Sequence, residues 1–368
     1  MAMTTMTQSA MDDSGGGVVG GVDTHRDTHT AAVLDARGRL LGTAEFPATQ
    51  DGYARVLAWL RGFGPLSRVG VEGTGAYGAG LARSLAGHGI TVLEVARPDR
   101  RARRVRGKSD PFDAENAARA VLSQDGTRVS TPKDRAGATE ALRAVRVARR
   151  SAVAARAIVL NQIHTLLVTA PEPLRSQLRG LAPARVIAVC AGEDPAQLTD
   201  PAHIGDPATA TRLALYHLAR RHHHLCGEIT ALDQVATALV ERINPALLQL
   251  PGVGPDCAGQ LLVTAGDNPD RLHSEAAFAH LCGVAPIPAS SGHTHRHRLN
   301  RGGDRQANAA LYRITLSRLR WDPRTRDYQQ RRTHQGLTNK DIIRCLKRYI
   351  AREIYNTLTN PTTSTNTP

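Results

Sequence analysis

The sequence GVVGGVDTHRDTHTAAVLDARGRLLGTAEF, residues 17–46, decides the fold of the N-terminal part of this chain. Short apolar runs predict strands over residues 17–23, 30–34 and 40–46. The tetrapeptide DARG at residues 35–38, between the second and third runs, is typical of a hairpin turn. The stretch therefore predicts three strands that follow one another through short connections.

Strands and helices alternate after these three strands. Further apolar runs predict strands over residues 68–72 and 91–95, and apolar residues at helical spacing predict helices over residues 51–63 and 77–88. A hairpin meander followed by alternating strands and helices implies a mixed sheet that is covered by helices. We therefore expect an α/β domain in this part of the chain.

Four carboxylates occupy positions where a site can form. Asp23 ends the first predicted strand, and Glu72 ends the strand RVGVE. In open sheets functional groups gather at the carboxyl ends of strands. Asp110 and Asp113 lie in KSDPFDAENAARAVL, where Pro111 indicates a helix start and the i, i+3 spacing places both acids on one helical face.

Together these four acids favour a metal site. Hard oxygen donors suit Mg²⁺, for which Mn²⁺ can substitute, and such an ion assists phosphoryl transfer. A structural interpretation stays open, because an aspartate at a helix start also caps the helix and complements its dipole. The residue types alone do not choose between the two.

The charge balance points to a polyanionic partner. Lys and Arg total 47 against 33 Asp and Glu, so the chain of 368 residues carries a formal net charge of +14. Basic surfaces bind phosphate backbones by releasing counterions. Because only 4% of the residues are aromatic, base stacking is not expected to be the main mode of contact.

Composition also excludes several classes of protein. The five cysteines are scattered without a CxxC pair, which argues against a disulfide framework and a zinc site. The N-terminal residues lack the basic-then-apolar pattern of a signal peptide, and no long charge-free apolar run is present. We expect a cytoplasmic protein without a membrane partner.

The middle of the chain is predicted to be helical over residues 139–169 and 208–243. The first of these stretches carries an apolar seam suited to coiled-coil pairing, and Arg149 and Arg156 interrupt it. The seam consists of Leu142, Val145, Ala152, Val159, Ile163 and Leu166. We expect this region to form a scaffold and to support dimerisation.

The C-terminal region opens with LPGVG at residues 250–254, the signature of a helix–hairpin–helix turn. Its glycines permit a tight turn, and the backbone N–H groups of the next helix can face a DNA phosphate. A basic stretch follows, with eleven arginines against three aspartates between His293 and Arg332. We expect a mainly α-helical domain that contacts nucleic acid.

The segments GVDTHRDTHT, VGVEGTGAYG and KSDPFDAENAARA resemble the transposases of the insertion sequence 110 family, which include the Piv invertase. In that family the helix acids occur in the pattern K-[ST]-D-x-x-D, matched here by residues 108–113. The resemblance extends from about residue 18 to 355. It implies an RNase H-like domain of the RuvC type, whose DEDD set would bind Mg²⁺ through Asp23, Glu72, Asp110 and Asp113.

The resemblance also implies a nucleophilic serine in a Ser-Gly pair, matched by Ser291-Gly292, with Ser290 as the adjacent competitor. It implies a DNA transposase or site-specific recombinase that exchanges strands through a 5′-phosphoserine intermediate. Family members are guided by a structured RNA from the element. The implied partners are therefore donor and target DNA, the guide RNA and further copies of the chain, as a dimer and as a tetramer on DNA.

The domain prediction combines these observations. Residues 18–125 form the RuvC-like catalytic domain, 126–245 the helical coiled-coil region and 246–356 the C-terminal transposase domain, with disordered tails at 1–17 and 357–368. A nucleoid-associated location in a bacterial cytoplasm is expected. The predicted nucleic-acid contacts are Arg101, Arg103, Arg104, Arg106, Lys108, Gly252, Gly254, Arg296, Arg298, Arg301 and Arg305.

Two other functions remain open from the sequence. A RuvC-like Holliday-junction resolvase would keep the acids and cleave with metal-activated water, without a protein–DNA adduct. A non-enzymatic nucleic-acid-binding protein, or an inactive relic of a mobile element, would use the acids only structurally. The second of these predicts that Asp23→Ala loses neither product nor metal affinity.

Overall fold

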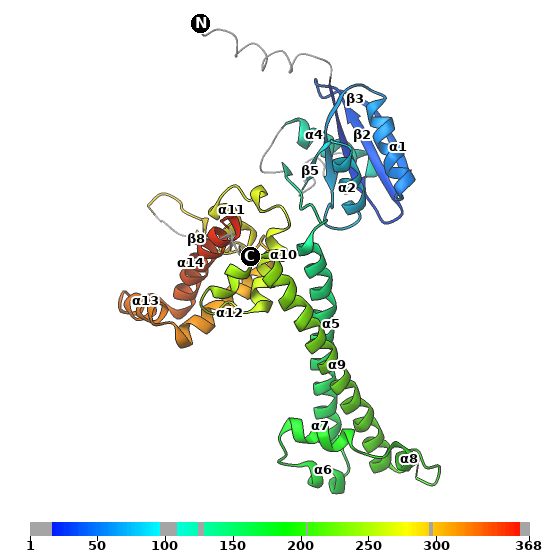
Figure 1. Ribbon diagram of the computed structural model, residues 1–368, viewed down its shortest axis with the longest axis vertical. Coiled ribbons are helices and arrows are strands. Elements are labelled where there is room, and N and C mark those ends of the chain that lie inside the picture. Colours follow the sequence, from blue (N-terminus) through cyan, green and yellow to red (C-terminus); the bar gives the residue numbers. More distant parts are fainter. Residues whose placement is uncertain (1–16, 96–108, 124–128, 204, 294–296, 361–368) are drawn as a thin grey trace, which may run out of the picture. The chain divides into compact units, whose positions relative to one another are not determined.

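The computed structural model describes residues 17–95, 109–123, 129–203, 205–293 and 297–360 (Figure 1). The chain divides into two compact units, which are described separately. The first unit contains residues 1–136 and 266–273, and the second contains residues 137–265 and 274–368.

The first unit is built on one mixed sheet with the strand order β3-β2-β1-β4-β5-β6. Strands β1, β2 and β3 form the antiparallel meander, β4 and β5 continue the sheet in parallel to β1, and β6 pairs antiparallel at the edge. The strands are β1 (Val18–Thr24), β2 (Thr28–Leu34), β3 (Leu40–Pro47), β4 (Leu66–Glu72), β5 (Thr91–Val95) and β6 (Val129–Ser130). The predicted α/β class is confirmed, whereas β6 was not predicted.

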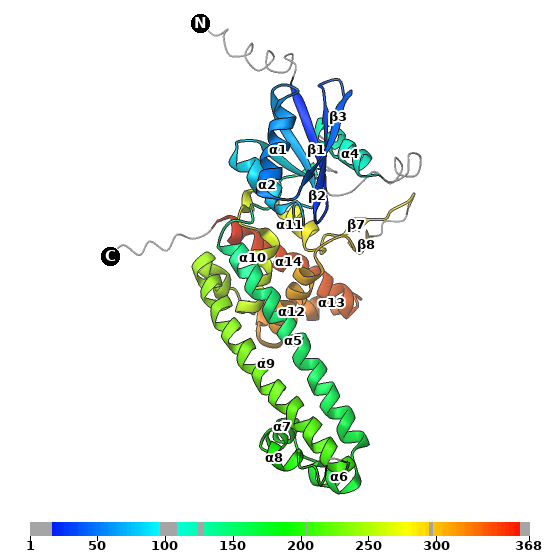
Figure 2. The same cartoon turned by 90° about the vertical axis from the view of Figure 1, so that its right-hand side faces the viewer.

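Helices cover both faces of this sheet (Figure 2). Helices α1 (Gln50–Arg61) and α2 (Ala79–Gly87) pack on one face through a core that includes Val22, Leu60 and Val69. Helix α4 (Asp110–Leu122) packs on the other face against Val19 and Leu34. The side chains of β1 therefore alternate between the two layers, as the period of a strand requires.

The helix expected over residues 77–88 begins later than predicted. Gly73 adopts a positive φ of 64° and its carbonyl accepts hydrogen bonds from the N–H groups of Ala76 and Gly78, at 2.8 and 3.1 Å. Residues 73–78 thus form turns, and α2 starts at Ala79. The sequence pattern identified the helix but placed its first residue too early.

In the second unit, α5 (Ala138–Thr169) packs lengthwise against α9 (Pro207–Ile243), as both views show (Figures 1 and 2). The predicted seam is buried in this pairing at Ala152, Val159 and Ile163. The seam therefore contacts a helix of the same chain. Its interruption by Arg149 is explained by an ion pair and hydrogen bonds with Asp233 of α9.

By length and composition α5 is also able to cross a membrane. Only 17% of the residues in its most apolar window are buried within the structure. Nevertheless α5 carries arginines that pair with carboxylates, including Arg146 with Asp256 at 2.9 Å. Apolar length alone is weak support for a membrane span, since a long helix of a helical hairpin has the same composition.

Three short helices that the sequence analysis did not resolve lie between α5 and α9. They are α6 (Glu172–Leu178), α7 (Pro183–Ala191) and α8 (Pro195–Leu198). Leu178, Val186 and Cys190 belong to the same apolar core as the α5–α9 pairing. The prolines in this segment prevent a continuous helix, because proline lacks the N–H that an interior helical position donates.

The rest of the second unit is mainly α-helical. Its elements are the 3₁₀-helix η1 (Pro245–Gln249), α10 (Pro255–Ala265), α11 (Glu275–Leu281), β7 (Ile287–Pro288), β8 (His297–Arg298), α12 (Arg305–Trp321), α13 (Pro323–His334) and α14 (Asn339–Thr359). The intervening 3₁₀-helix η2 (Pro269–Arg271) belongs to the first unit. Strands β7 and β8 pair antiparallel and form a small hairpin.

Helix α14 continues past Thr357, where a disordered tail was predicted to begin. Leu358 is buried, and the Asn244 side-chain amide donates a hydrogen bond to the Thr357 carbonyl oxygen at 3.0 Å. The polar sequence of this segment gives no sign of these contacts, which come from distant parts of the chain. The prediction of disorder is therefore wrong for residues 357–359.

Candidate metal and nucleic-acid sites

Asp23 and Glu72 lie on the same face of the sheet. Gly21 of β1 and Gly70 of β4 are partners in the parallel register, and both are covered by α4. Asp23 and Glu72 each follow two residues later, so the strand period directs both side chains to the α4 face. The Thr24 hydroxyl donates a hydrogen bond to the Glu72 carbonyl oxygen at 2.8 Å, which holds the two strand ends together.

The remaining two acids come from the first turn of α4. Ser109 is extended, the helix begins at Asp110, and the Asp113 N–H donates to the Ser109 carbonyl oxygen at 3.0 Å. Asp113 is buried with 1% of its surface exposed, and the Asp110 side chain is about half exposed. The predicted spacing is thus realised as one helical turn.

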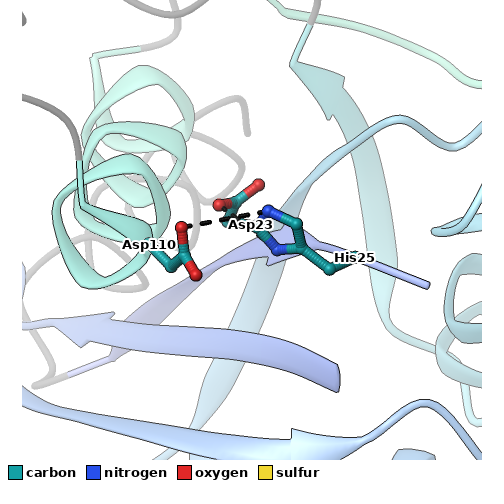
Figure 3. Close-up of side chains that lie close together, drawn as sticks. All are labelled: Asp23, His25 and Asp110. Atoms are coloured by element: carbon teal, nitrogen blue, oxygen red, sulfur yellow. Dashed lines mark ion pairs between the residues drawn. The ribbon is translucent and has the colours of Figure 1, made fainter. Parts of the chain in front are cut away.

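His25 joins the first strand to this helix, and the sequence analysis missed it. Its Nδ1 lies 3.9 Å from the Asp23 Oδ2, and its Nε2 lies 3.9 Å from the Asp110 Oδ1 (Figure 3). One ligand atom from each of these three residues lies within 4.8 Å of the others. The available signal was a histidine two residues beyond a carboxylate that ends a strand.

The donor set fits a divalent cation. Ligands on opposite sides of an octahedral ion lie about 4.2 Å apart, since each bond is about 2.1 Å long. The ligand atoms of Asp23, His25 and Asp110 lie up to 4.8 Å apart. Only one pair among three ligands can be opposite, so side-chain rotations have to bring the other pairs closer for all three to bind one ion. Two carboxylate oxygens suit Mg²⁺ or Mn²⁺, and an imidazole nitrogen is better accepted by Mn²⁺.

A second histidine lies near the carboxyl end of β1. His29 lies on β2 opposite Thr24 and is fully buried. Burial lowers its pKa, which outweighs its hydrogen bond with the Thr28 carbonyl oxygen. Its ring stacks on Tyr53 of α1 at a centroid distance of 5.7 Å. His29 thus packs on the α1 face of the sheet, whereas Asp23 and Glu72 lie on the α4 face.

Ser290 and Ser291 lie in the connection between β7 and β8, and both are exposed. Gly292 follows with a positive φ of 54°, a conformation that favours glycine. The four acids belong to the first compact unit and these serines to the second. Within the first unit the structure brings Asp23 and Asp110 together around His25.

The basic residues among the predicted nucleic-acid contacts divide into two groups. Arg298, Arg301 and Arg305 are exposed and lie on β8, on the loop after it and at the start of α12. The remaining predicted basic residues lie outside the residues that the structure describes. These are Arg101, Arg103, Arg104, Arg106, Lys108 and Arg296.

The LPGVG turn joins η1 to α10. Gly252 has a positive φ of 71°, and a Cβ at this position would lie 3.2 Å from the Ser317 Cβ of α12. Arg318 of α12 donates from Nε to the Pro251 carbonyl oxygen at 2.7 Å. Gly254 has open space around it and directly precedes α10. The turn is therefore fixed on one side by α12 and open at Gly254.

Two protein-family models match this chain. A family model for the DEDD transposases of insertion sequence 110, described as "Transposase", matches residues 20–170. A second model, described as "Transposase IS116/IS110/IS902 family", matches residues 244–330. The chain belongs to the insertion sequence 110 family of transposases. The first match to this family contains all four acids, and the second contains Ser291.

This member of the insertion sequence 110 family is similar to two curated proteins over part of their length. It is 33% identical over 145 residues to the "Insertion element IS110 uncharacterized 43.6 kDa protein" of Streptomyces coelicolor, covering 39% of this chain and 33% of that protein. It is 28% identical over 134 residues to the "Insertion element IS900 uncharacterized 42 kDa protein" of Mycobacterium paratuberculosis, covering 34% of each. The matched stretch spans about a third of these curated relatives.

Proposed function

We propose that this protein is the transposase of an insertion sequence, a recombinase that cuts and rejoins DNA in a bacterial cytoplasm. One observation carries the proposal: α4 packs its first turn against the carboxyl end of β1, so that Asp110 and Asp23 lie around His25. Family membership and the net charge of +14 support a DNA substrate. The strand order β3-β2-β1-β4-β5 supports a RuvC-like domain.

Asp23, Glu72, Asp110 and Asp113 would hold Mg²⁺, and His25 would orient or join this set. When bound, the ion would supply positive charge next to phosphoryl oxygens that become more negative during strand cleavage. The side chains themselves fix its place, because two come from strand ends and two from one helical turn. Asp23 and Asp113 are buried, so their carboxylates are held in place by the packing around them.

The chemistry we propose for the serine is a direct displacement at phosphorus. The Ser291 Oγ forms a bond to a DNA phosphorus, the bond from phosphorus to the 3′ oxygen breaks, and the serine proton ends on that oxygen. The products are a 5′-phosphoserine and a free 3′-hydroxyl, so the energy of the phosphodiester is retained for rejoining. The exposed position of Ser291 in a hairpin loop supports access to DNA.

The partners we propose are donor and target DNA and a structured RNA of the element. The positive charge without many aromatic residues supports recognition of phosphate backbones, which leaves sequence choice to base pairing. The fixed LPGVG turn and its open Gly254 support a helix–hairpin–helix contact with a phosphate. Because the acids and Ser291 belong to different compact units, a site composed from two or more copies is compatible with the fold.

The test is a search for a covalent protein–DNA adduct. Purified protein, RNA from the flanking sequence, junction DNA and Mg²⁺ are incubated and resolved on a denaturing gel, with Ser291→Ala, Asp23→Asn and Ser290→Ala as variants. We expect the adduct in wild type and Ser290→Ala and its loss in the other two. Cleaved DNA without an adduct, unaffected by Ser291→Ala, would contradict the serine mechanism and indicate a resolvase.

A further inference from the structure

A cavity that the proposed chemistry does not use lies in the second unit. It has a volume of about 800 Å³ and is bounded by the loop after α11, strand β8 and helices α12 and α14. Sites that enclose a small organic molecule usually measure roughly 300–1,000 Å³. The cavity is therefore large enough to hold a group of the size of a nucleotide.

Its wall is strongly basic. The cations that line it are Arg298, Arg301, Arg344, Lys347 and Arg348, and Asp341 is the one carboxylate among the described lining residues. Arg344 pairs with Asp341 at 2.6 Å, and Arg348 pairs with Glu275 at 3.0 Å. Within the described part of the chain, no carboxylate lies within ion-pair distance of Arg298, Arg301 or Lys347. Among the described residues, these three cations around one cavity thus form no ion pair with a carboxylate.

Lys347 is the most informative of these cations. Burial lowers the pKa of its ammonium group, and the nearby Arg344 guanidinium lowers it further. The ammonium donates a hydrogen bond to the Asn308 Oδ1 at 2.8 Å, which holds it in place but does not neutralise it. A half-buried ammonium beside another cation is unfavourable unless an anion approaches. A phosphate group would supply that anion.

Other residues of the lining are suited to a base. Tyr349 lines the cavity with about half of its surface exposed, and Tyr328 of α13 contacts it edge to face at a centroid distance of 5.6 Å. Val284, Pro286 and Leu299 add apolar surface. Aromatic side chains bind unpaired bases by stacking, whatever the identity of the base.

We propose that this cavity receives one unpaired nucleotide of the bound nucleic acid, with its phosphate on Lys347, Arg298 and Arg301 and its base against Tyr349. A paired nucleotide cannot place its base in such a pocket, because that base lies inside the helical stack. The inference rests on the proposed nucleic-acid function. It extends that function, since it assigns recognition of an extruded or frayed nucleotide to a place on the fold.

The position of the cavity links it to the proposed nucleophile. Arg298 belongs to β8, and its register partner Ile287 lies on β7, four residues before Ser291. A nucleotide held at Arg298 would therefore contact the same hairpin that carries the serine. Binding an unpaired nucleotide there would fix the hairpin relative to α12 and α14, which also line the cavity.

The test measures binding to two duplexes that each contain one fluorescent 2-aminopurine nucleotide. This nucleotide is bulged in one duplex and paired in the other, and both duplexes are prepared in DNA and again in RNA. The full-length wild-type protein is expected to prefer the bulged probe about tenfold, a range typical of one stacked base. Stacking is expected to quench the 2-aminopurine signal. Tyr349→Leu and Lys347→Met should lose the preference, whereas Tyr349→Phe should retain it.

Matched controls come from the same unit. Tyr312 is 43% exposed on α12 and Lys340 is exposed at the start of α14, and neither lines the cavity. Tyr312→Leu and Lys340→Met are expected to keep the preference, and thermal melts verify that every variant is folded. Equal binding of bulged and paired probes by wild type, or an unchanged preference in Tyr349→Leu and Lys347→Met, overturns this inference alone. Absence of binding to every probe overturns the proposed function as well.

Discussion

Gly21 of β1 and Gly70 of β4 are register partners, and α4 crosses both of them at a distance that admits no side chain. A Cβ on Gly21 would lie 2.1 Å from the Ala118 backbone nitrogen and 2.2 Å from the Ala114 carbonyl oxygen. A Cβ on Gly70 would lie 2.7 Å from the Ala117 carbonyl oxygen. This close approach brings the first turn of α4 to the strand ends that carry Asp23 and Glu72.

The first prediction concerns this contact. Gly21→Ala is expected to lower the free energy of unfolding by about 3 kcal/mol, because the added methyl group meets helix backbone that has no room to move. Urea unfolding measures the change. Gly87→Ala is the control, since a Cβ there meets nothing within 4 Å and alanine favours a helix by about 0.5–1 kcal/mol. Equal stability of both variants would contradict the packing argument.

The second prediction concerns the metal site. Asp23→Asn is expected to weaken Mn²⁺ binding by at least about tenfold, and His25→Gln by a smaller factor, since the imidazole lies 3.9 Å from both carboxylates. Electron paramagnetic resonance of free Mn²⁺ gives the affinities. Asp27→Asn serves as the control because its side chain is 85% exposed. Unchanged affinity in Asp23→Asn would mean that the acids are structural.

The third prediction concerns the junction of α5, α10 and α12. Asp256 lies 2.9 Å from both Arg146 and Arg313 and 3.4 Å from Arg149. Burial raises the pKa of its carboxyl, but these guanidinium groups outweigh burial and leave the pKa below its usual value. Asp256→Asn leaves three cations without this partner, so we expect a loss of about 3 kcal/mol in unfolding free energy.

Chemical denaturation measures this loss, with Asp327→Asn on the exposed surface of α13 as the control. The control is expected to change stability by less than about 0.5 kcal/mol, as is usual for exposed substitutions. A loss of similar size in both variants would show that Asp256 has no special role at the junction.

The fourth prediction concerns pH. Hydrogen bonds from Arg348 and Arg352 lower the pKa of Glu275 from 4.5 to about 2. A carboxyl whose pKa is depressed in the folded state stabilises the protein above its unfolded pKa, and this contribution is lost as pH falls towards the folded pKa. The Tm difference between wild type and Glu275→Gln should therefore be constant above about pH 5.5 and shrink between about pH 4.5 and 2. A difference that grows on acidification would contradict this assignment.

Local patterns predicted much of the first unit because its main strands and helices are long enough to show a regular pattern. The apolar run in Val18–Thr24 and the turn at Asp35–Gly38 depend on neighbouring residues, so both were visible in the sequence. The same holds for the helix start at Asp110, where Pro111 and two acids occupy the first turn. The placement of the carboxylates at the strand ends and at this helix start could therefore be predicted, and their role as metal ligands stays a prediction.

The paired edge strand Val129–Ser130 and the three short helices between α5 and α9 could not be predicted in this way. Each is too short to show a period, and its stability comes from contacts with distant segments. The last turn of α14 is a similar case, since Asn244 and the burial of Leu358 keep residues 357–359 helical.

By itself the sequence determined the strand meander, the order of the four acids, the apolar seam of α5 and the excess of positive charge, because these properties depend on residue type and local spacing. Only the tertiary structure decided that α4 covers Gly21 and Gly70 and that His25 lies between Asp23 and Asp110. It also decided that α9 of the same chain packs on the seam. Period and spacing assign a side chain to a face, whereas the element that packs on that face is selected by complementary shape and charge over the whole fold.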